Sequence, residues 1–492
     1  MFRSTSVAAL ASLAVVLGGG TAVAAPPGIF HVSSFGAVAD GVTNAAPAIN
    51  DAVTAAHAAG GGVVTFDAGN YLLAGTVKLK SDVTIELKAG STITGSAGGY
   101  DPPESNPYDK YQDYGHSHFR NAMFFGDKVD NVKFIGAGTI DGGGHLITGN
   151  PKSGQADKII SITRCTNFTL SGIKLRRGGH FAALINGCTG VTSESLVIDT
   201  ASDRDGWNII STRNVKINNI KAAANDDALA FKSDYALGQK LPNGNVTVTN
   251  AQLSAGCCNA LMFGSETCGD FTGYDFSNIT ITGAGKSGLG LVSMDGAVIS
   301  DVHYRDIKMS GTKSPIMIKV GTRKRCGNNP GVGKVHHITY DNITGTSAGS
   351  FSPTMWGEPG SISDITMNNV NLNLPGGSGT MSTNPPSNDP KNYNPNSIGT
   401  RPAFGWYLHN VTNLKFTNSS VKFGKDDGRP AVIVNNGSKV TFDHFTAQRG
   451  GKSPSDVLVQ NVSGYCVRDS ANTSGGALRI GNSGSAEGCA SN

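Results

Sequence analysis

Two pairs of carboxylates lie close together near the middle of the chain. Asp203 and Asp205 belong to the segment SDRDGWNII, and Asp226 and Asp227 are neighbours in NDDALAFKSD. Close carboxylates push one another's pKa values apart, so that one stays protonated while the other is ionised. Cleavage of a glycosidic bond by an acid and a base needs that division. A solvated acidic patch and a Ca²⁺ site, which takes about six to eight oxygens, are the other interpretations.

The spacing of the two pairs fits one turn of a repetitive structure. Asp205 precedes Asp226 by 21 positions, so we expect these two carboxylates at the same corner of adjacent coils. Asp227 joins them only if the strand is interrupted there, because neighbours in a regular strand face opposite sides. Asn225 tolerates a left-handed backbone and is expected to supply that break.

These carboxylates lie within a sequence repeat that has a period of about 24 residues. Several segments, such as CTNFTLSGIKL and TRNVKINNIKA, begin with a turn residue and continue in strict alternation. Alignment on Val132, Phe168, Val191, Val215, Val246, Tyr274 and Val298 gives successive steps of about 36, 23, 24, 31, 28 and 24 along the chain. Such a repeat, with occasional insertions, is typical of a β-solenoid in which each coil is buried by the coils above and below.

One helix and two long insertions interrupt the repeat. In residues 45–62, Ala, Ile and Val recur at helical spacing until Gly60, which predicts an amphipathic helix that caps the first coil. Residues 98–116 and 374–402 are rich in Pro, Asn, Ser and Gly. They are either ordinary long loops or the walls of a cleft in which tyrosine faces stack on sugar rings. The first insertion contains Tyr100, Tyr108, Tyr111 and Tyr114.

The N-terminal segment 1–25 is typical of a secretory signal peptide. Arg3 precedes the apolar run VAALASLAVVLGG, and the small residues TAVAA stand before Pro26. The run is too short to cross a membrane, so we expect cleavage near Ala24 or Ala25 and a secreted, extracellular protein with no membrane partner. The net charge of +4 includes no basic run, which argues against binding to nucleic acid.

Export makes the eight cysteines potential disulfides. Cys466 and Cys489 lie about one coil apart in the sequence and are expected to staple the C-terminal tail. Cys165 and Cys188 have the same separation, which brings them to about 4.8 Å in space. They are either bonded or only stacked, and we favour the bond. The pairing of the others stays open, and a zinc site is disfavoured because no His lies at ligand spacing beside them. These are Cys257, Cys258, Cys268 and Cys326.

The motifs together resemble those of glycoside hydrolase family 28, the polygalacturonase family. The family's NTDG is similar to DRDG at 203–206, its GDDCIAIKSG to NDDALAFKSD at 225–234, and its SGGHGLSIGSE to SAGCCNALMFGSE at 254–266. The opening SFGAVADGVTNAAPAINDAV resembles the capping segment of the wider pectin-degrading superfamily. The resemblance covers most of residues 30–440 and implies an all-β fold, a single-stranded right-handed parallel β-helix with an N-terminal capping α-helix.

The same resemblance implies the roles of the carboxylates. Asp226 corresponds to the general acid that protonates the leaving glycosidic oxygen, and Asp205 and Asp227 to the pair that positions and deprotonates the attacking water. The family inverts the configuration at the sugar carbon, which needs carboxyl groups about 6.5–9.5 Å apart. Neither a metal nor a cofactor is expected.

Several positions depart from the family pattern. Asp203 stands where the family has Asn, and Asn259 stands where it has His. The family's Arg and Lys that grip the galacturonate carboxylate align with Gly290 and Val292, neither of which can hold an anion. Lys286 is one of two cations that could take over the grip. We expect the substrate to be contacted by Asp203, Lys232, Asn259 and Glu266, with Lys232 as the other cation.

The sequence therefore predicts a monomeric, secreted, inverting glycoside hydrolase that acts on a polysaccharide or oligosaccharide, with a neutral or rhamnose-containing substrate. The predicted domains are a signal peptide at 1–25, a catalytic β-helix at 26–465 and a stapled tail at 466–492. A calcium-dependent β-helix polysaccharide lyase is one alternative, for which Arg204 is the only basic neighbour of the carboxylates. A non-catalytic carbohydrate-binding solenoid is the other.

Overall fold

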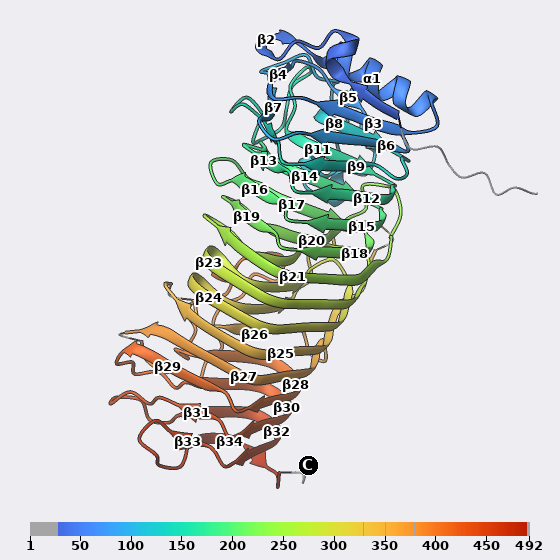
Figure 1. Ribbon diagram of the computed structural model, residues 1–492. Coiled ribbons are helices and arrows are strands. Elements are labelled where there is room, and N and C mark those ends of the chain that lie inside the picture. The colour runs from blue at the N-terminus through green and yellow to red at the C-terminus, as the bar shows by residue number, and fades with distance from the viewer. Residues whose placement is uncertain (1–27, 328, 350, 378, 490–492) are drawn as a thin grey trace, which may run out of the picture.

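The chain winds into a long right-handed parallel β-helix, shown in a computed structural model that describes residues 28–489 except 328, 350 and 378 (Figure 1). Its strands join into one 34-stranded sheet, and the named strands pair in parallel. The predicted signal peptide lies outside the described residues. No helix in the described part of the chain has the length and apolar character to cross a membrane.

Short strands build the N-terminal coils, three to a coil where the repeat is regular. The strands of this part are β1 (Gly28–His31), β2 (Asp40–Asn44), β3 (Gly62–Phe66), β4 (Gly69–Leu73), β5 (Val77–Lys78), β6 (Val83–Leu87), β7 (Ser91–Gly95), β8 (Ala122–Asp127), β9 (Lys133–Gly136), β10 (Thr139–Asp141), β11 (Lys158–Thr163), β12 (Thr166–Ser171), β13 (Lys174–Arg176), β14 (Phe181–Asn186), β15 (Thr189–Glu194), β16 (Val197–Thr200), β17 (Asp205–Ile210), β18 (Arg213–Asn218), β19 (Lys221–Ala224) and β20 (Leu229–Ser233).

Longer strands that run round the corners form many of the later coils. They and the strands between them are β21 (Asn243–Ala255), β22 (Leu261–Thr267), β23 (Phe271–Ser293), β24 (Val298–Val320), β25 (Lys334–Ser347), β26 (Thr354–Trp356), β27 (Ile362–Gly376), β28 (Trp406–Thr417), β29 (Ser420–Lys425), β30 (Val432–Asp443), β31 (Thr446–Ala447), β32 (Val457–Arg468), β33 (Ala471–Asn472) and β34 (Ile480–Ala486). Short 3₁₀ turns occur at Val32–Phe35, Asp109–Tyr111, Tyr114–His116 and Pro395–Ser397.

The coils stack through rows of like residues. Inside the β-helix, the rings of Phe276, Tyr304 and Tyr340 stack on one another from coil to coil, with centroid distances of 5.1 and 4.8 Å. The apolar face of each coil is thus covered by its neighbours. At one corner the amides of Asn278 and Asn250 continue the pattern, because Asn278 Nδ2 donates to Asn250 Oδ1 at 2.6 Å. Both residues have positive φ, which Asn adopts more readily than most side chains.

The predicted repeat is confirmed except at its last step. Phe168 pairs with Val191 and Val246 pairs with Tyr274, as the alignment requires. Tyr274, however, pairs with Val302 rather than with Val298. Val298 and Val302 are identical residues an even number of positions apart, so the residue type at this position does not distinguish the two registers. The stacking of aromatic rings one coil apart distinguishes the two registers.

The predicted helical cap is present. Helix α1 (Ala46–Ala58) lies across the N-terminal end of the β-helix, where it covers the first coils (Figure 1). Pro47 lies in its first turn, where the missing N–H costs nothing. Ile49, Ala52 and Val53, on the inner face of the helix, are fully buried. The helix thus removes from water an apolar end that an open β-solenoid would expose.

The other end of the described chain is a further coil. β34 pairs in parallel with β32, so much of the predicted tail continues the β-helix. The Cys466–Cys489 and Cys165–Cys188 disulfides are both present as predicted. The pairings that the sequence left open are Cys257–Cys258 and Cys268–Cys326.

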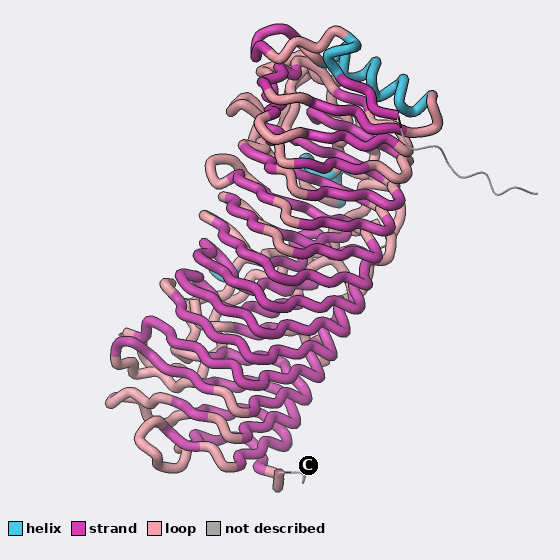
Figure 2. Tube along the Cα trace, viewed as in Figure 1, coloured by secondary structure: helices cyan, strands magenta, loops and turns pink. Residues whose placement is uncertain are grey.

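Both long insertions reach the same face of the coils. Figure 2 shows the strands as a regular stack, with loops leaving it along its length. From the first insertion, His116 contacts Lys232 on β20. From the second, Tyr393 contacts Lys286 on β23. This face also holds the carboxylates singled out in the sequence.

Candidate active site

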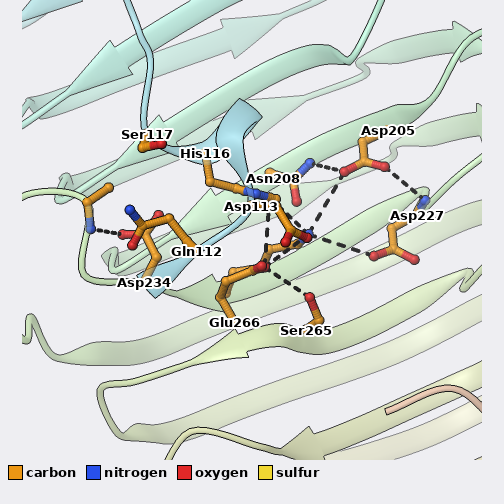
Figure 3. Close-up of polar contacts among 12 residues, drawn as sticks. Gln112, Asp113, His116, Ser117, Asp205, Asn208, Asp227, Asp234, Ser265 and Glu266 are labelled. Carbon is orange, nitrogen blue, oxygen red and sulfur yellow. Dashed lines mark hydrogen bonds and ion pairs between the residues drawn. The ribbon is translucent and has the colours of Figure 1, made fainter. Parts of the chain in front are cut away.

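Asp205 and Asp227 face each other across adjacent coils. The backbone N–H of Asp227 donates to Asp205 Oδ1 at 3.3 Å, and the N–H of Gly206 donates to the carbonyl oxygen of Asp227 at 2.8 Å (Figure 3). The coil between them is therefore 22 residues long, as the pairing of Trp207 with Leu229 also shows. The expectation that Asp226 stacks directly on Asp205 was wrong by one residue.

Asp226 stacks instead on Arg204. The guanidinium donates to Asp226 Oδ2 from Nη2 at 2.9 Å and from Nε at 3.2 Å. The predicted left-handed break at Asn225 is also wrong, since Asn225 is not among the positive-φ residues. Both carboxylates reach the same face because residues 225–228 form an irregular turn that precedes β20. Asn225 holds this turn in place by donating to the carbonyl oxygen of Asp203 at 3.1 Å.

The glycine of the DRDG segment is required by the close approach of the next coil. A Cβ atom on Gly206 would lie 2.3 Å from the carbonyl oxygen of Ala228. That oxygen accepts the N–H of Trp207, so it cannot move away without the loss of a pairing between the coils. Gly206 thus allows the strand that begins with Asp205 to lie directly under the turn that carries Asp227.

Lys232 lies beneath the two facing carboxylates. Its ammonium nitrogen is 3.9 Å from Asp205, 4.0 Å from Asp227 and 3.6 Å from Glu266. Burial alone would lower the pKa of Lys232, but the three carboxylates raise it above its ordinary value. The ammonium also lies 3.1 Å from His116 Nε2, and burial lowers the pKa of His116 to about 4. A neutral His116 accepts a hydrogen bond from the charged Lys232.

The pKa values of Asp205 and Asp227 are raised. Burial is the largest cause for both, and the negative charge of Asp226 is the next. Lys232 opposes the shift without cancelling it. A raised pKa makes the ionised carboxylate a stronger base, so either group accepts a proton from a reacting molecule more readily than a free aspartate does.

Glu266 is the ionised counter-charge of this cluster. Burial would raise its pKa, but the cations Lys232 and Arg325 hold the pKa well below the usual range. Arg325 Nη2 donates to Glu266 Oε1 at 2.6 Å. With 1% of Glu266 and 4% of Lys232 exposed, the structure places these two predicted substrate contacts underneath the carboxylates.

Asn259 and Asp203 lie on either side of the facing pair. Asn259 donates from Nδ2 at 2.8 Å and from its backbone at 3.1 Å to Asp227 Oδ1, so it orients Asp227 rather than Asp226. Asp203 is partly exposed and accepts the N–H of Gly179 at 3.3 Å. Burial raises the pKa of Asp203. Of the four predicted substrate contacts, Asp203 is the one that solvent reaches most readily.

Tyr393 is a site residue that the sequence did not single out. It comes from the second insertion, and the Lys286 ammonium lies 5.2 Å from its ring centroid. Burial, and after it the charge of Asp227, raises the pKa of the Tyr393 hydroxyl. The signal in the sequence was the break in the repeat at 374–402, which was interpreted as either a loop or a cleft wall. The contacts of Tyr393 bring part of the second insertion to the face that holds the carboxylates.

Lys319 secures the loop that carries Tyr393. Its ammonium is held by four oxygens at 2.7–2.8 Å, and burial lowers its pKa to about 7. The oxygens belong to Asn388, Asp389, Asn392 and Ser397. The tyrosines of the first insertion hold that loop against the rest of the protein. Tyr100 is buried, and Tyr108 and Tyr111 pack edge-on against Tyr235, which follows β20.

The floor beside the carboxylates is apolar. Gly290 and Val292 lie on the strand that pairs with β22, and Met262 stands opposite Gly290. Val292 is 1% exposed and packs with Met262 and Met294, while Tyr393 covers the group. The positions where the resemblance called for an arginine and a lysine thus belong to a buried apolar cluster beneath Tyr393.

Among the described residues, one group of possible metal ligands that contains no disulfide-bonded cysteine lies within the site. Oxygen or nitrogen atoms of Asp113, His116 and Glu266 lie within 4.8 Å of one another. Arg325 bonds both carboxylates of this group, and Lys232 contacts His116 and Glu266. Cationic side chains thus already supply the positive charge that a bound metal ion would bring to these ligands.

The comparisons with known proteins agree with this geometry. Residues 62–393 match the model of glycosyl hydrolases family 28. The chain belongs to this family. It is a polygalacturonase-like glycosidase that hydrolyses O-glycosyl bonds. A polygalacturonase of Malus domestica is 22% identical over 366 residues, which are 70% of this chain and 74% of that protein. An endo-polygalacturonase of Pectobacterium carotovorum subsp. carotovorum is 25% identical over 46% of this chain and 60% of its own length.

Solved structures show the same fold. The family 28 exopolygalacturonase of Yersinia enterocolitica superposes with a TM-score of 0.60 at 17% identity and covers 86% of this chain and 79% of its own. The hyperthermoactive exopolygalacturonase of Thermotoga maritima has a TM-score of 0.57 at 16% identity, with 79% and 92% covered. The β-helix of this family 28 protein is thus shared with enzymes of very different sequence.

Proposed function

We propose that this protein is a secreted inverting glycoside hydrolase in which Asp226 is the acid and Asp205 and Asp227 activate the water. The observation that carries the proposal is the position of the family motifs, which bring three aspartates to one face of two adjacent coils over a buried lysine. Membership of a hydrolase family favours hydrolysis over the lyase and the binding-only interpretations. Secretion is supported by the predicted signal peptide and by the four disulfides.

Each carboxylate has a geometry that suits its proposed role. Both contacts of Arg204 go to Asp226 Oδ2, which leaves Oδ1 to carry the proton for the leaving oxygen. Asn208 and the backbone of Asp227 orient Asp205, while Asn259 orients Asp227. Water attacks the anomeric carbon, its proton passes to the facing pair, and the glycosidic C–O bond breaks as Asp226 protonates the departing sugar.

Lys232, Glu266 and Asn259 support this chemistry from below. When the facing pair gains a proton, its attraction to Lys232 weakens, and Glu266 remains to hold the ammonium in place. We propose these three residues as positioning groups, and Asp203 as a substrate contact at the edge of the site. Tyr393 and Lys286 form the opposite wall.

The apolar floor supports a neutral or rhamnose-containing sugar at the cleavage position. The carboxylate of a galacturonate would lose its water there, and burial of an unpaired anion is costly. The relatives are named polygalacturonases, so polygalacturonate is the substrate against which this proposal must be judged.

A polysaccharide panel tests the proposal. We expect purified protein to release reducing ends from a neutral or rhamnose-containing glycan faster than from unsubstituted polygalacturonate. Asp226→Asn is the inactive control, and Asp199→Asn, at an exposed carboxylate outside the site, is the matched active control. Faster turnover of polygalacturonate than of every neutral glycan would overturn the substrate assignment. Loss of that turnover in Lys286→Met would then identify Lys286 as the cation that holds the carboxylate.

A further inference from the structure

A disulfide between consecutive residues touches the proposed acid. Cys257 and Cys258 are bonded to each other in the turn between β21 and β22. Both sulfur atoms and a carboxylate oxygen of Asp226 lie within 4.8 Å of one another. On the other side of the carboxylate lies Arg204. The disulfide thus forms one wall of the space into which the leaving sugar must place its oxygen.

The backbone fixes this disulfide between two coils. The N–H of Cys257 donates to the carbonyl oxygen of Asn225 at 2.6 Å, in the coil that carries Asp226. The carbonyl oxygen of Cys258 accepts the N–H of Lys286 at 2.9 Å, in the next coil. Because both ends of the turn are held, a change of chemistry at the sulfurs alters the surface beside Asp226 more than it alters the fold.

Solvent reaches this disulfide more readily than the others in the described chain. Cys257 is exposed, whereas its partner Cys258 is 4% exposed. Cys489 is partly exposed. The remaining cysteines are less than a tenth exposed, and they are Cys165, Cys188, Cys268, Cys326 and Cys466. Thiol exchange requires that an attacking thiolate reach a sulfur atom, so exposure selects Cys257.

We propose that the Cys257–Cys258 disulfide is a site of exchange with small thiols, and that modification there blocks Asp226. The inference rests on the proposed role of Asp226 as the acid. The thiolate of the small thiol attacks Cys257 Sγ, the Cys257–Cys258 bond breaks, and Cys258 Sγ leaves as a thiolate that takes a proton from water. The product is a mixed disulfide at Cys257. A second small thiol attacks the sulfur of the bound thiol and releases Cys257 as a thiol, with one small-molecule disulfide formed.

Modification at Cys257 would obstruct the acid sterically. The side chain of Asp226 is 16% exposed, so only a small part of it faces the substrate. A group attached to Cys257 Sγ lies beside this part, since the sulfur and a carboxylate oxygen are within 4.8 Å. Loss of access to a general acid costs about 10²–10⁴-fold in rate. The reduced protein with two unmodified thiols should retain activity, because nothing yet covers Asp226.

Selective alkylation tests the proposal. Native protein is treated with graded 2-mercaptoethanol and then with iodoacetamide, and modified peptides are identified by mass spectrometry. We expect Cys257 to be alkylated at thiol concentrations that leave the other disulfides intact, with activity reduced at least about 100-fold in step with that modification. The matched control Cys257→Ala/Cys258→Ala should lose less than about twofold under the same treatment. Methyl methanethiosulfonate in place of iodoacetamide should inhibit reversibly, and activity should return with excess reductant.

The outcomes separate this inference from the proposed function. Full alkylation of Cys257 without loss of activity, or equal loss in the double variant, would overturn the inference. Alkylation of another cysteine before Cys257 would overturn it as well. If the double variant does not fold, methyl methanethiosulfonate tests the inference on the natural chain, where inhibition that does not reverse with excess reductant would overturn it. Asp226→Asn tests the proposed function by itself, since its activity depends on the acid and its Cys257 labelling does not.

Discussion

At the scale of single residues, the site is a balance of buried charges. Asp205, Asp227 and Glu266 surround Lys232, and Asp226 faces Arg204 at the surface of the same cluster. The repulsion between neighbouring aspartates is therefore shared between two cations. This division separates the roles, because the buried pair and the more exposed acid have different surroundings.

Asp226→Asn should abolish hydrolysis while the protein stays folded. An amide of the same shape cannot supply a proton, and general acid catalysis is worth about 10²–10⁴-fold or more. Initial rates and the thermal unfolding midpoint are the measurements. Activity within about threefold of the parent would remove Asp226 from the role of the acid.

Asp205→Asn should stabilise the protein at high pH. The folded pKa of Asp205 is raised by burial and by Asp226, so the folded state binds this proton more tightly than the unfolded state, in which the pKa is about 4. Stability is therefore lost as pH rises from that value through the higher folded pKa. The asparagine side chain does not titrate in this pH range, so the variant does not lose this part of its stability.

The free energy of unfolding, measured by urea titration at pH 5 and pH 8, checks this expectation. The advantage of Asp205→Asn over the parent should grow by about 1 kcal/mol or more between the two. The exposed Asp199→Asn is the control. An advantage that shrinks as pH rises would contradict the assigned shift.

At the scale of elements, two insertions complete a site that the coils only begin. The strands supply the aspartates and Lys232, while the loops bring His116 and Tyr393. A loop contributes to a site only when its backbone is held, and Lys319 provides that for the second insertion. The apolar floor and the wall above it thus have separate origins in the chain.

Lys319→Met should loosen the wall without touching the carboxylates. Loss of the ammonium removes the donor that four oxygens of this loop share, and a loop with fewer contacts opens more readily. We expect KM to rise about tenfold with a smaller change in kcat. Proteolysis should then cut within 374–402. The exposed Lys391→Met is the matched control, and equal effects of the two changes would contradict the role of Lys319.

Cations restored to the floor should favour an acidic sugar. Gly290→Arg with Val292→Lys would provide the missing partners for a galacturonate carboxylate. A Cβ at residue 290 would lie 2.5 Å from Met262 Sδ, but a methionine side chain is flexible enough to move. Affinity for galacturonate oligomers, measured calorimetrically on the Asp226→Asn background, should rise. Unchanged affinity would show that this floor does not meet the sugar carboxylate.

At the scale of the whole molecule, local sequence patterns predicted the repeating elements well, whereas they did not predict contacts between distant segments. The repeat revealed the solenoid because each coil buries the same positions, and helical spacing in 45–62 revealed the cap. The last register, at Val298, was wrong because Val302, four residues later, is the same residue type and takes the place opposite Tyr274. The break at Asn225 was wrong because the turn is set by hydrogen bonds to the previous coil.

The site was predictable only where motif and period coincide. Asp205, Asp226 and Asp227 recur at the length of one coil, so their proximity follows from the repeat. Tyr393 and His116 lie in insertions that have no period, and each is far along the chain from the lysine it contacts. Nothing in local sequence encodes such a contact. The vicinal cysteines were visible in the sequence, but their position against Asp226 depends on the stacking of coils.

The configuration of the first product distinguishes an inverting hydrolase from a retaining one. In the proposed mechanism, water attacks the face opposite the departing oxygen while Asp226 protonates that oxygen, which inverts the anomeric carbon. Proton NMR during the first minutes of hydrolysis of the best substrate in the panel, before mutarotation, should show the inverted anomer. A retained anomer, or an unsaturated sugar in place of a hydrolysis product, would contradict the assignment of Asp205, Asp226 and Asp227.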